Sequence, residues 1–361
     1  MNKNLKIAFF SVGFAFNRLV RMRYYEGIFP KDVEIFLITT DKYQDQDKWK
    51  LKRTKLIVLK NKPLKNLIKI RKICGKENIQ ILSNLGHPFG AIPLIFAGLF
   101  KKIKILLYIL GDSIDYPKID TLTKSGLNYF FSLIPYWFIE KFSNKIAFVG
   151  YNSYKKAPVF FLSPTNKFYY LHAPVNTKIF YPIAKQKARK ELKIKSDEKV
   201  IVYVGRITKR KGGNLLKEII KTNSNVKFIL IGRWIEKGMP KFNYKNMIQI
   251  EKVPNDQLPK YYSASDLVFA YHRQGCQMGI VGEEALACGV PILHTNRIHA
   301  KESDAIIKTS DNKESANKKI NEFLSLPKKE RKKLSKEARE YAEKYLSDDV
   351  WKDKYLDFYL R

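Results

Sequence analysis

Short apolar runs alternate with longer helical patterns along this chain, which predicts an α/β protein with two doubly wound, Rossmann-like domains. Six apolar runs form a first series: 7–10, 33–39, 56–59, 79–83, 103–109 and 145–149. Five more form a second series: 200–204, 226–231, 247–250, 267–271 and 291–294. Runs this uniformly apolar are typical of parallel strands that helices bury on both faces. We therefore expect one parallel sheet in each half of the chain.

The two series are separated by a segment with a different composition. It contains Pro174, Pro182 and the charged stretch 185–191, which indicate a linker followed by a surface helix. We predict an N-terminal domain over residues 1–175 and a second domain over residues 176–340. Facing domains of this kind bind ligands at the carboxyl ends of their strands, so a cleft is expected there.

The end of the chain is predicted to be helical. Residues 341–361 are expected to form a C-terminal helix that packs back on the N-terminal domain. An aromatic series supports this packing: Tyr341, Tyr345, Trp351, Tyr355 and Tyr359.

The composition describes a folded and strongly basic protein. Of its 361 residues 45% are hydrophobic and 13% aromatic, which excludes general disorder. The formal net charge is +34, from 68 Lys and Arg against 34 Asp and Glu. Such a charge attracts polyanions or anionic lipid surfaces, although a compositional bias explains it equally well because the basic residues are spread over the whole chain. No nucleic-acid-binding motif is present, so no specific nucleic-acid partner is predicted.

The cysteines and the lengths of the apolar runs indicate the cellular compartment of the protein. The three cysteines are odd in number and show no ligand spacing, so neither a disulfide framework nor a metal site is predicted. The first apolar run resembles a signal peptide, but arginines follow it directly and we interpret it as a strand that ends at Gly13. No apolar run reaches the roughly 20 residues that span a bilayer. A cytoplasmic protein is expected.

Two glycine-containing segments carry the candidate chemistry. In 279–288 a helix is expected to begin near a glycine, and its free N–H groups would suit a phosphate. The alternative is a short buried helix whose Glu283 and Glu284 lie in its first turn and complement the helix dipole. The second segment places Arg206 and Lys211 on one strand-to-helix loop between glycines, where they could neutralise a diphosphate. The alternative there is a solvated basic loop.

Together these segments resemble the GT-B glycosyltransferases, and in particular the large retaining, nucleotide-sugar-dependent family 4. The matching segments are Gly205-Arg206 with Lys211-Gly212, 169–182, 258–266 and 284–292. The last of these, Glu-Ala-Leu-Ala-Cys-Gly-Val-Pro-Ile, is similar to the family's Glu-Ala-Met-Ala-x-Gly-x-Pro-Val signature. The resemblance covers nearly the whole chain. It implies a GT-B fold and a nucleotide diphosphate sugar as donor substrate, with no cofactor and no metal.

The resemblance also assigns donor-binding residues. Glu284 would accept hydrogen bonds from the ribose hydroxyls, and Arg206 and Lys211 would stabilise the departing diphosphate. Backbone groups of one segment would complete the phosphate and sugar cradle: Met278, Gly279, Ile280 and Val281. Close backbone approach would involve Gly205 and, unless it is a plain turn glycine, Gly13.

Two departures from the family affect the donor and acceptor sides. The family's first motif glutamate corresponds to Cys276, with Gln277 beside it, and a thiol cannot replace a carboxylate as acceptor for sugar hydroxyls. The family's catalytic histidine corresponds to Leu110, so Asp112 and Asp115 are candidates to replace it.

Two of the acceptor-side candidates also have structural explanations. Asp112 would orient or deprotonate the acceptor hydroxyl, or else be an N-cap or turn residue. His87 would line the acceptor side or be a turn histidine. We interpret His172 and His272, which follow predicted strands, as structural.

A predicted helix over 62–76 would carry a basic stripe: Lys62, Lys65, Lys69, Lys72 and Lys76. Leu67, Ile70 and Cys74 would face the other way, so this helix could lie on anionic headgroups. The resulting hypothesis is a transferase, peripheral on the inner face of the cytoplasmic membrane, that glycosylates a lipid-linked or glycan acceptor. Alternatives are a degenerate sugar-nucleotide-binding protein or a GT-B epimerase or phosphorylase. The sequence gives no indication of the oligomeric state.

Overall fold

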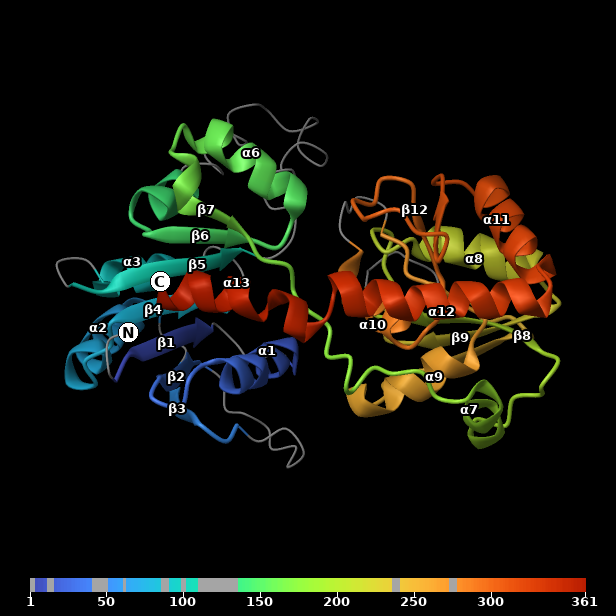
Figure 1. Ribbon diagram of the computed structural model, residues 1–361, viewed down its shortest axis with the longest axis horizontal. Helices are drawn as coiled ribbons and strands as arrows, with labels where there is room; N and C mark the ends of the chain where they lie inside the picture. The colour runs from blue at the N-terminus through green and yellow to red at the C-terminus, as the bar shows by residue number, and fades with distance from the viewer. Residues whose placement is uncertain are drawn as a thin grey trace. The chain divides into compact units, whose positions relative to one another are not determined.

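The computed structural model describes residues 4–11, 16–40, 51–60, 63–85, 91–98, 102–109, 136–235, 241–272 and 278–361. Contacts divide the chain into two compact units. Unit 1 comprises Met1–His172 and Lys352–Arg361, and unit 2 comprises Ala173–Trp351 (Figure 1). Each unit holds one parallel sheet, which confirms the predicted fold class.

Unit 1 contains a seven-stranded sheet in the order β3-β2-β1-β4-β5-β6-β7. Its strands are β1 Lys6–Ser11, β2 Glu34–Thr39, β3 Thr54–Val58, β4 Ile81–Asn84, β5 Lys104–Ile109, β6 Lys145–Phe148 and β7 Phe168–Tyr170. Its helices include α1 Phe16–Ile28, α2 Pro63–Lys76, α3 Ile92–Gly98 and α6 Tyr151–Phe161. Every strand pair is parallel, with register such as Phe9↔Leu37 between β1 and β2. Central strands are almost wholly buried, as their apolar sequences predict.

Unit 2 contains a six-stranded parallel sheet in the order β10-β9-β8-β11-β12-β13. Its strands are β8 Lys199–Val204, β9 Val226–Ile231, β10 Met247–Ile250, β11 Leu267–Phe269, β12 Ile292–Thr295 and β13 Ile306–Thr309. Its helices are α7 Lys185–Glu191, α8 Gly213–Thr222, α9 Leu258–Ala264, α10 Gly279–Ala287, α11 Lys313–Ser325 and α12 Lys328–Tyr345. One buried cluster lies under α8 and α11, and another under α7, α9, α10 and α12, so helices cover both faces (Figure 1).

The strand order of unit 2 creates a switch point. The chain enters at β8, adds β9 and β10 on one side, and then crosses to place β11 on the other side of β8. The loops that follow β8 and β11 therefore leave the sheet in opposite directions. In open α/β sheets this divergence opens a crevice at the carboxyl ends of the two strands, where ligands bind.

The expected single helix over 341–361 is wrong. The structure has two helices there, because α12 ends at Tyr345 and α13 spans Asp348–Leu360. The break is stabilised by acidic residues Asp348 and Asp349 in the first turn of α13 and by Trp351, whose Nε1 donates to the carbonyl of Tyr345 at 2.9 Å.

Within unit 1, the end of α13 packs by its aromatic residues, as the sequence predicts. Tyr355 and Tyr359 are each 1% exposed. The Tyr355 hydroxyl lies 2.8 Å from that of Tyr108 on β5, and the Tyr359 hydroxyl 3.2 Å from that of Tyr25 on α1. Phenol rings contribute large buried area, and mutual hydrogen bonds satisfy their hydroxyls in the interior. Residues 352–361 thereby complete the core of the unit that begins the chain.

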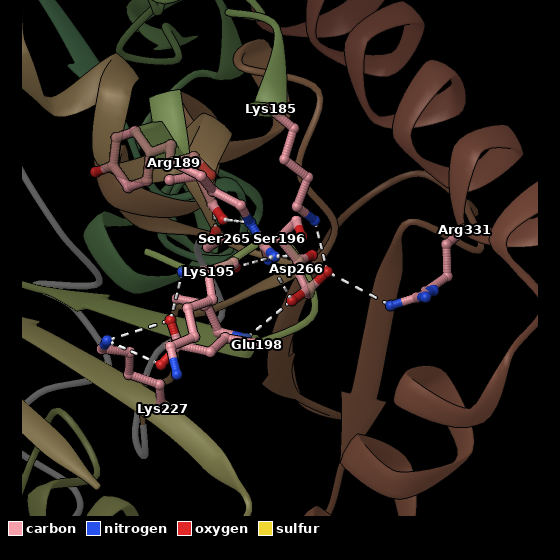
Figure 2. A network of polar contacts seen from close by, with 12 residues as sticks. Lys185, Arg189, Lys195, Ser196, Glu198, Lys227, Ser265, Asp266 and Arg331 are labelled. Carbon is pink, nitrogen blue, oxygen red and sulfur yellow. Dashed lines mark hydrogen bonds and ion pairs between the residues drawn. The ribbon is translucent and has the colours of Figure 1, made fainter. Parts of the chain in front are cut away.

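A buried carboxylate joins three elements of unit 2 (Figure 2). Asp266 lies just before β11 and is 9% exposed. Its Oδ2 accepts from Arg189 Nη2 at 3.0 Å and from the backbone N–H of Val200 at 2.8 Å. Its Oδ1 accepts from Lys185 Nζ at 2.5 Å and from Arg331 Nη1 at 3.4 Å. One side chain therefore ties α7 and α12 to β8, at the end of β11 opposite the switch point.

Two strands were not expected from the sequence. β7 has only three residues and β13 contains Lys308, so neither stands out as an apolar run. Both lie at sheet edges, where one neighbouring strand suffices and partial exposure allows polar residues. Within the described ranges, no helix is both long enough and apolar enough to cross a bilayer.

Candidate functional site

The loop after β8 is shaped by two glycines. Gly205 has φ +131° and Gly212 has φ +72°, conformations that L-residues rarely adopt. A Cβ on Gly212 would lie 2.7 Å from Cδ1 of Tyr271, which follows β11. The Tyr203 hydroxyl donates to the carbonyl of Arg206 at 2.7 Å and so holds the turn from the strand into the loop. The sequence thus fixes a tight loop that packs against the end of the neighbouring strand.

Lys211 folds back across this loop. Its Nζ lies 2.9 Å from the position that a Cβ on Gly205 would take. Burial lowers the pKa of Lys211, and Arg206 and Arg210 lower it further. Among the residues that the structure describes, no carboxylate forms an ion pair with Lys211 or Arg206. The loop therefore concentrates positive charge, which would favour a bound anion.

Two histidines of neighbouring strands also bear on this site; the sequence indicates a structural role for His272 and does not single out His294. His272 follows β11, and Arg210, Lys211 and His294 all act on its imidazole. His294 lies on β12 and is 0% exposed. Burial, with the neighbouring cations in the case of His272, lowers the pKa of each ring to about 4, so both are neutral near pH 7. A histidine after an apolar strand carries no distinguishing pattern, so only the order β8-β11-β12 brings His272 to the loop of Lys211 and His294 to His272.

The third part of the site is the start of α10. The helix begins at Gly279, whose φ is +72°, after an N-cap residue, Met278, that makes no side-chain capping bond. Its first N–H groups are therefore available to an acceptor. Glu283 and Glu284 lie in the second turn, so the alternative that they complement the dipole from the first turn is wrong. Ile280 is 46% exposed, while Val281 packs at the edge of the core.

Gly282 has a packing role. A Cβ there would lie 2.6 Å from Cγ of Met278 and 3.2 Å from Cδ1 of Ile292. Gly282 therefore leaves room for the neighbouring side chains of Met278 and Ile292. Around the Cβ position of Gly279, by contrast, no atom of the described residues lies within 4 Å.

Glu284 is a buried acid held by two neighbours. It is 3% exposed, its Oε2 accepts from the Tyr262 hydroxyl at 2.8 Å, and its Oε1 accepts from Asn255 Nδ2 at 3.5 Å. Burial raises the pKa of this carboxyl to about 7; Tyr262 and Asn255 oppose the shift, and Glu283 adds to it. Near neutrality the group is thus divided between its charged and neutral forms.

We expect Glu284→Gln to change how stability depends on pH. Because the folded-state pKa lies above the ordinary value, the wild type binds more protons when folded between about pH 4.5 and 7, and its stability falls as pH rises through this window. Glutamine does not titrate. The free energy of unfolding of the variant relative to wild type should therefore rise by something of the order of 3 kcal/mol from pH 4.5 to pH 8. Urea denaturation at both pH values measures this; parallel pH profiles for the two proteins would contradict it.

Several predicted site residues lie outside the described part of the chain: Gly13, His87, Asp112, Asp115, Cys276 and Gln277. Their assignments stay predictions. Of the donor-side candidates that are described, Gly205, Arg206 and Lys211 share one loop after β8. Met278, Gly279, Ile280, Val281 and Glu284 all belong to α10 and its N-cap.

The match to a known protein family lies in unit 2. Residues 184–341 match the family model described as glycosyl transferases group 1. Spore coat protein SA of Bacillus subtilis (strain 168) is 27% identical over 213 residues, which cover 51% of this chain and 56% of that protein. The Staphylococcus aureus capsular polysaccharide biosynthesis glycosyltransferase CapM is 36% identical over 115 residues, 29% of this chain and 30% of that protein. The matches thus span little more than half of the first relative and less of the second.

The fold as a whole has solved counterparts. Anabaena Alr3699/HepE in complex with UDP-glucose superposes with a TM-score of 0.75, at 12% identity and with 98% of each chain covered. This likeness extends over both units and concerns the fold. The chain has the GT-B fold, and its residues 184–341 are similar to the glycosyl transferases group 1 family.

Proposed function

We propose that the protein is a retaining glycosyltransferase that moves a sugar from a nucleotide diphosphate donor to an acceptor hydroxyl. The observation that carries this proposal is the cluster of Arg206, Arg210 and Lys211 at the switch point of unit 2. Burial lowers the pKa of Lys211, and Arg206 and Arg210 lower it further. A diphosphate would supply the opposite charge beside Lys211.

The same arrangement suits the chemistry of glycosyl transfer. Breaking a glycosyl–phosphate bond leaves negative charge on the diphosphate, and cations fixed beforehand around it stabilise that charge. The N–H groups at the start of α10 add further donors to phosphate oxygens. Glu284 would accept from the ribose hydroxyls in its charged form. Because lysine and arginine provide the charge, we propose that the reaction needs no metal, and full activity in EDTA is the expected result.

A thermal-shift screen against nucleoside diphosphates and their sugars tests the donor. A ligand that binds only the folded protein stabilises it by mass action and so raises its melting temperature. At a ligand concentration of 100 times the Kd, the free energy of unfolding rises by about 2.7 kcal/mol. We expect the nucleoside diphosphates of one nucleobase to raise the melting temperature of the wild type and not that of Lys211→Ala. No stabilisation by any member of the panel would overturn the proposal.

The product of the reaction separates the alternatives. A transferase consumes the donor only when an acceptor is present. An epimerase releases free nucleoside diphosphate without any acceptor, and a phosphorylase requires inorganic phosphate. Binding without turnover would indicate a degenerate sugar-nucleotide-binding protein.

For the acceptor, we propose a glycan or lipid-linked sugar met at an anionic membrane surface. Similarity to CapM, a capsular polysaccharide biosynthesis glycosyltransferase, supports a glycan acceptor. Helix α2 supports the surface, because Lys65, Lys69, Lys72 and Lys76 are exposed while Ile70 and Cys74 are buried. The side chain of Lys62 lies outside the described residues. The protein would then be peripheral on the inner face of the cytoplasmic membrane.

Flotation with acidic liposomes at low salt tests this surface. The wild type should float, and a variant with the four α2 lysines changed to glutamine should not. A matched control changes four exposed lysines of α12 instead: Lys328, Lys329, Lys332 and Lys333. Equal loss of flotation in both variants would show that net charge alone is responsible, and a wild type that stays in solution would remove the membrane proposal.

A further inference from the structure

His272 occupies an unusual place for a histidine. It follows β11 at the switch point of unit 2, and its Nδ1 is buried without a hydrogen-bond partner among the described residues. A buried ring nitrogen without a partner is costly, so its retention requires an explanation. The loop that carries Lys211 packs against the residue before His272, since a Cβ on Gly212 would lie 2.7 Å from Cδ1 of Tyr271. The diphosphate of the proposed donor would lie on this loop.

The groups around His272 keep it neutral in the free protein. Arg210 and Lys211 reach it from the loop after β8, and His294 from β12. Burial lowers the pKa of the His272 imidazole most, and these three neighbours lower it further, to about 4. A diphosphate bound beside Lys211 would reverse the sign of the local field. Negative charge within a few ångströms favours the imidazolium.

We propose that His272 takes up one proton from solvent when a diphosphate group binds beside Lys211, and that the resulting imidazolium donates a hydrogen bond to the phosphate. This inference rests on the proposed donor site and adds a residue to it. Protonation makes both ring nitrogens hydrogen-bond donors, so the buried Nδ1 could then donate to a phosphate oxygen. The proton is recovered by solvent when the diphosphate leaves, and no other reactant is needed.

Proton uptake by His272 makes the affinity for a diphosphate depend on pH. Binding raises the pKa of His272 above its value in the free protein, so affinity for the diphosphate must rise as pH falls through the bound-state pKa. If that value returns to about 6.5, the affinity gain from pH 7.5 to pH 5.5 is about tenfold greater in wild type than in His272→Gln. The ligand's own titration is common to both proteins and cancels in this comparison.

Nuclear magnetic resonance of the histidine rings tests the proposal on the full chain. Inorganic pyrophosphate is the probe, because it carries the diphosphate without a nucleobase. The sequence contains five histidines, and the resonance missing in His272→Gln assigns the ring. We expect His272 to stay neutral from pH 5.5 to pH 8 without pyrophosphate and to titrate within this range at saturation. His299→Gln, at an exposed position, serves as the control and should retain the full effect.

Calorimetric titration with pyrophosphate distinguishes a failure of the His272 proposal from a failure of the proposed donor site. Pyrophosphate that binds wild type and not Lys211→Ala, while His272 remains neutral, would overturn the role of His272 and leave the donor site intact. Pyrophosphate that binds neither protein, or binds both equally, would overturn the diphosphate site itself and with it both proposals.

Discussion

Lys211→Ala is expected to reduce turnover by about two to three orders of magnitude, the usual effect of removing one fixed donor from developing negative charge. Its melting temperature should be unchanged or slightly higher. Lys211 is partly buried beside two guanidinium groups, and no described carboxylate pairs with it, so its removal relieves repulsion in the empty protein. Arg206→Ala should show the same pattern, with a smaller thermal effect because Arg206 is exposed.

Steady-state kinetics with thermal denaturation of the same samples measures this separation of activity from stability. Lys221→Ala, on the exposed face of α8 in the helix that follows the loop, is the matched control and should retain wild-type turnover. Wild-type activity in Lys211→Ala would remove its assigned role. A large fall in melting temperature would show instead that the lysine is structural.

Asp266→Ala is expected to have the opposite pattern, a fall of about 3–5 kcal/mol in the free energy of unfolding. The change leaves Arg189, 6% exposed, without its carboxylate and removes the acceptor of the Val200 N–H. Lys185 and Arg331 would then repel one another and Arg189 without a compensating charge (Figure 2). Removing one partner of a buried ionic group costs far more than the net contribution of the group, because the remaining charges stay buried.

Urea denaturation measures this loss. Asp197→Ala, at an exposed position before β8, is the control and should change stability by no more than about 0.5 kcal/mol. Donor affinity per folded molecule should persist in Asp266→Ala, since the carboxylate lies at the end of β11 opposite the site. A loss below about 1 kcal/mol would mean that water replaces the lost interactions.

The fold could be predicted largely because its strands are buried on both faces. Segments such as β9 and β5 are apolar along most of their length, so composition alone locates them. β7 and β13 were missed because edge strands are short or carry polar residues. The break between α12 and α13 was missed because the aromatic series continues across it. Packing in two different units, rather than one helix, explains that series.

The candidate site could be predicted only in part. Glycines beside Arg206 and Lys211, and the position of Glu284 in its signature, are local features that a sequence displays directly. His272 could not be linked to Lys211 from the sequence, because the two residues lie far apart in the chain. The interaction of His272 with Lys211 and with His294 follows from β11 lying between β8 and β12.

The sequence by itself determined the parallel α/β architecture, the basic loop between Gly205 and Gly212 and the candidate acid Glu284, since each depends on residues close together in the chain. Only the tertiary structure decided which charges act on one another. It placed Glu284 beside Tyr262 and Asn255, raising the pKa of Glu284 to about 7, and it placed His272 among cations that keep it neutral. The physical reason is that burial and electrostatic interaction depend on distance in space, and strand order sets that distance.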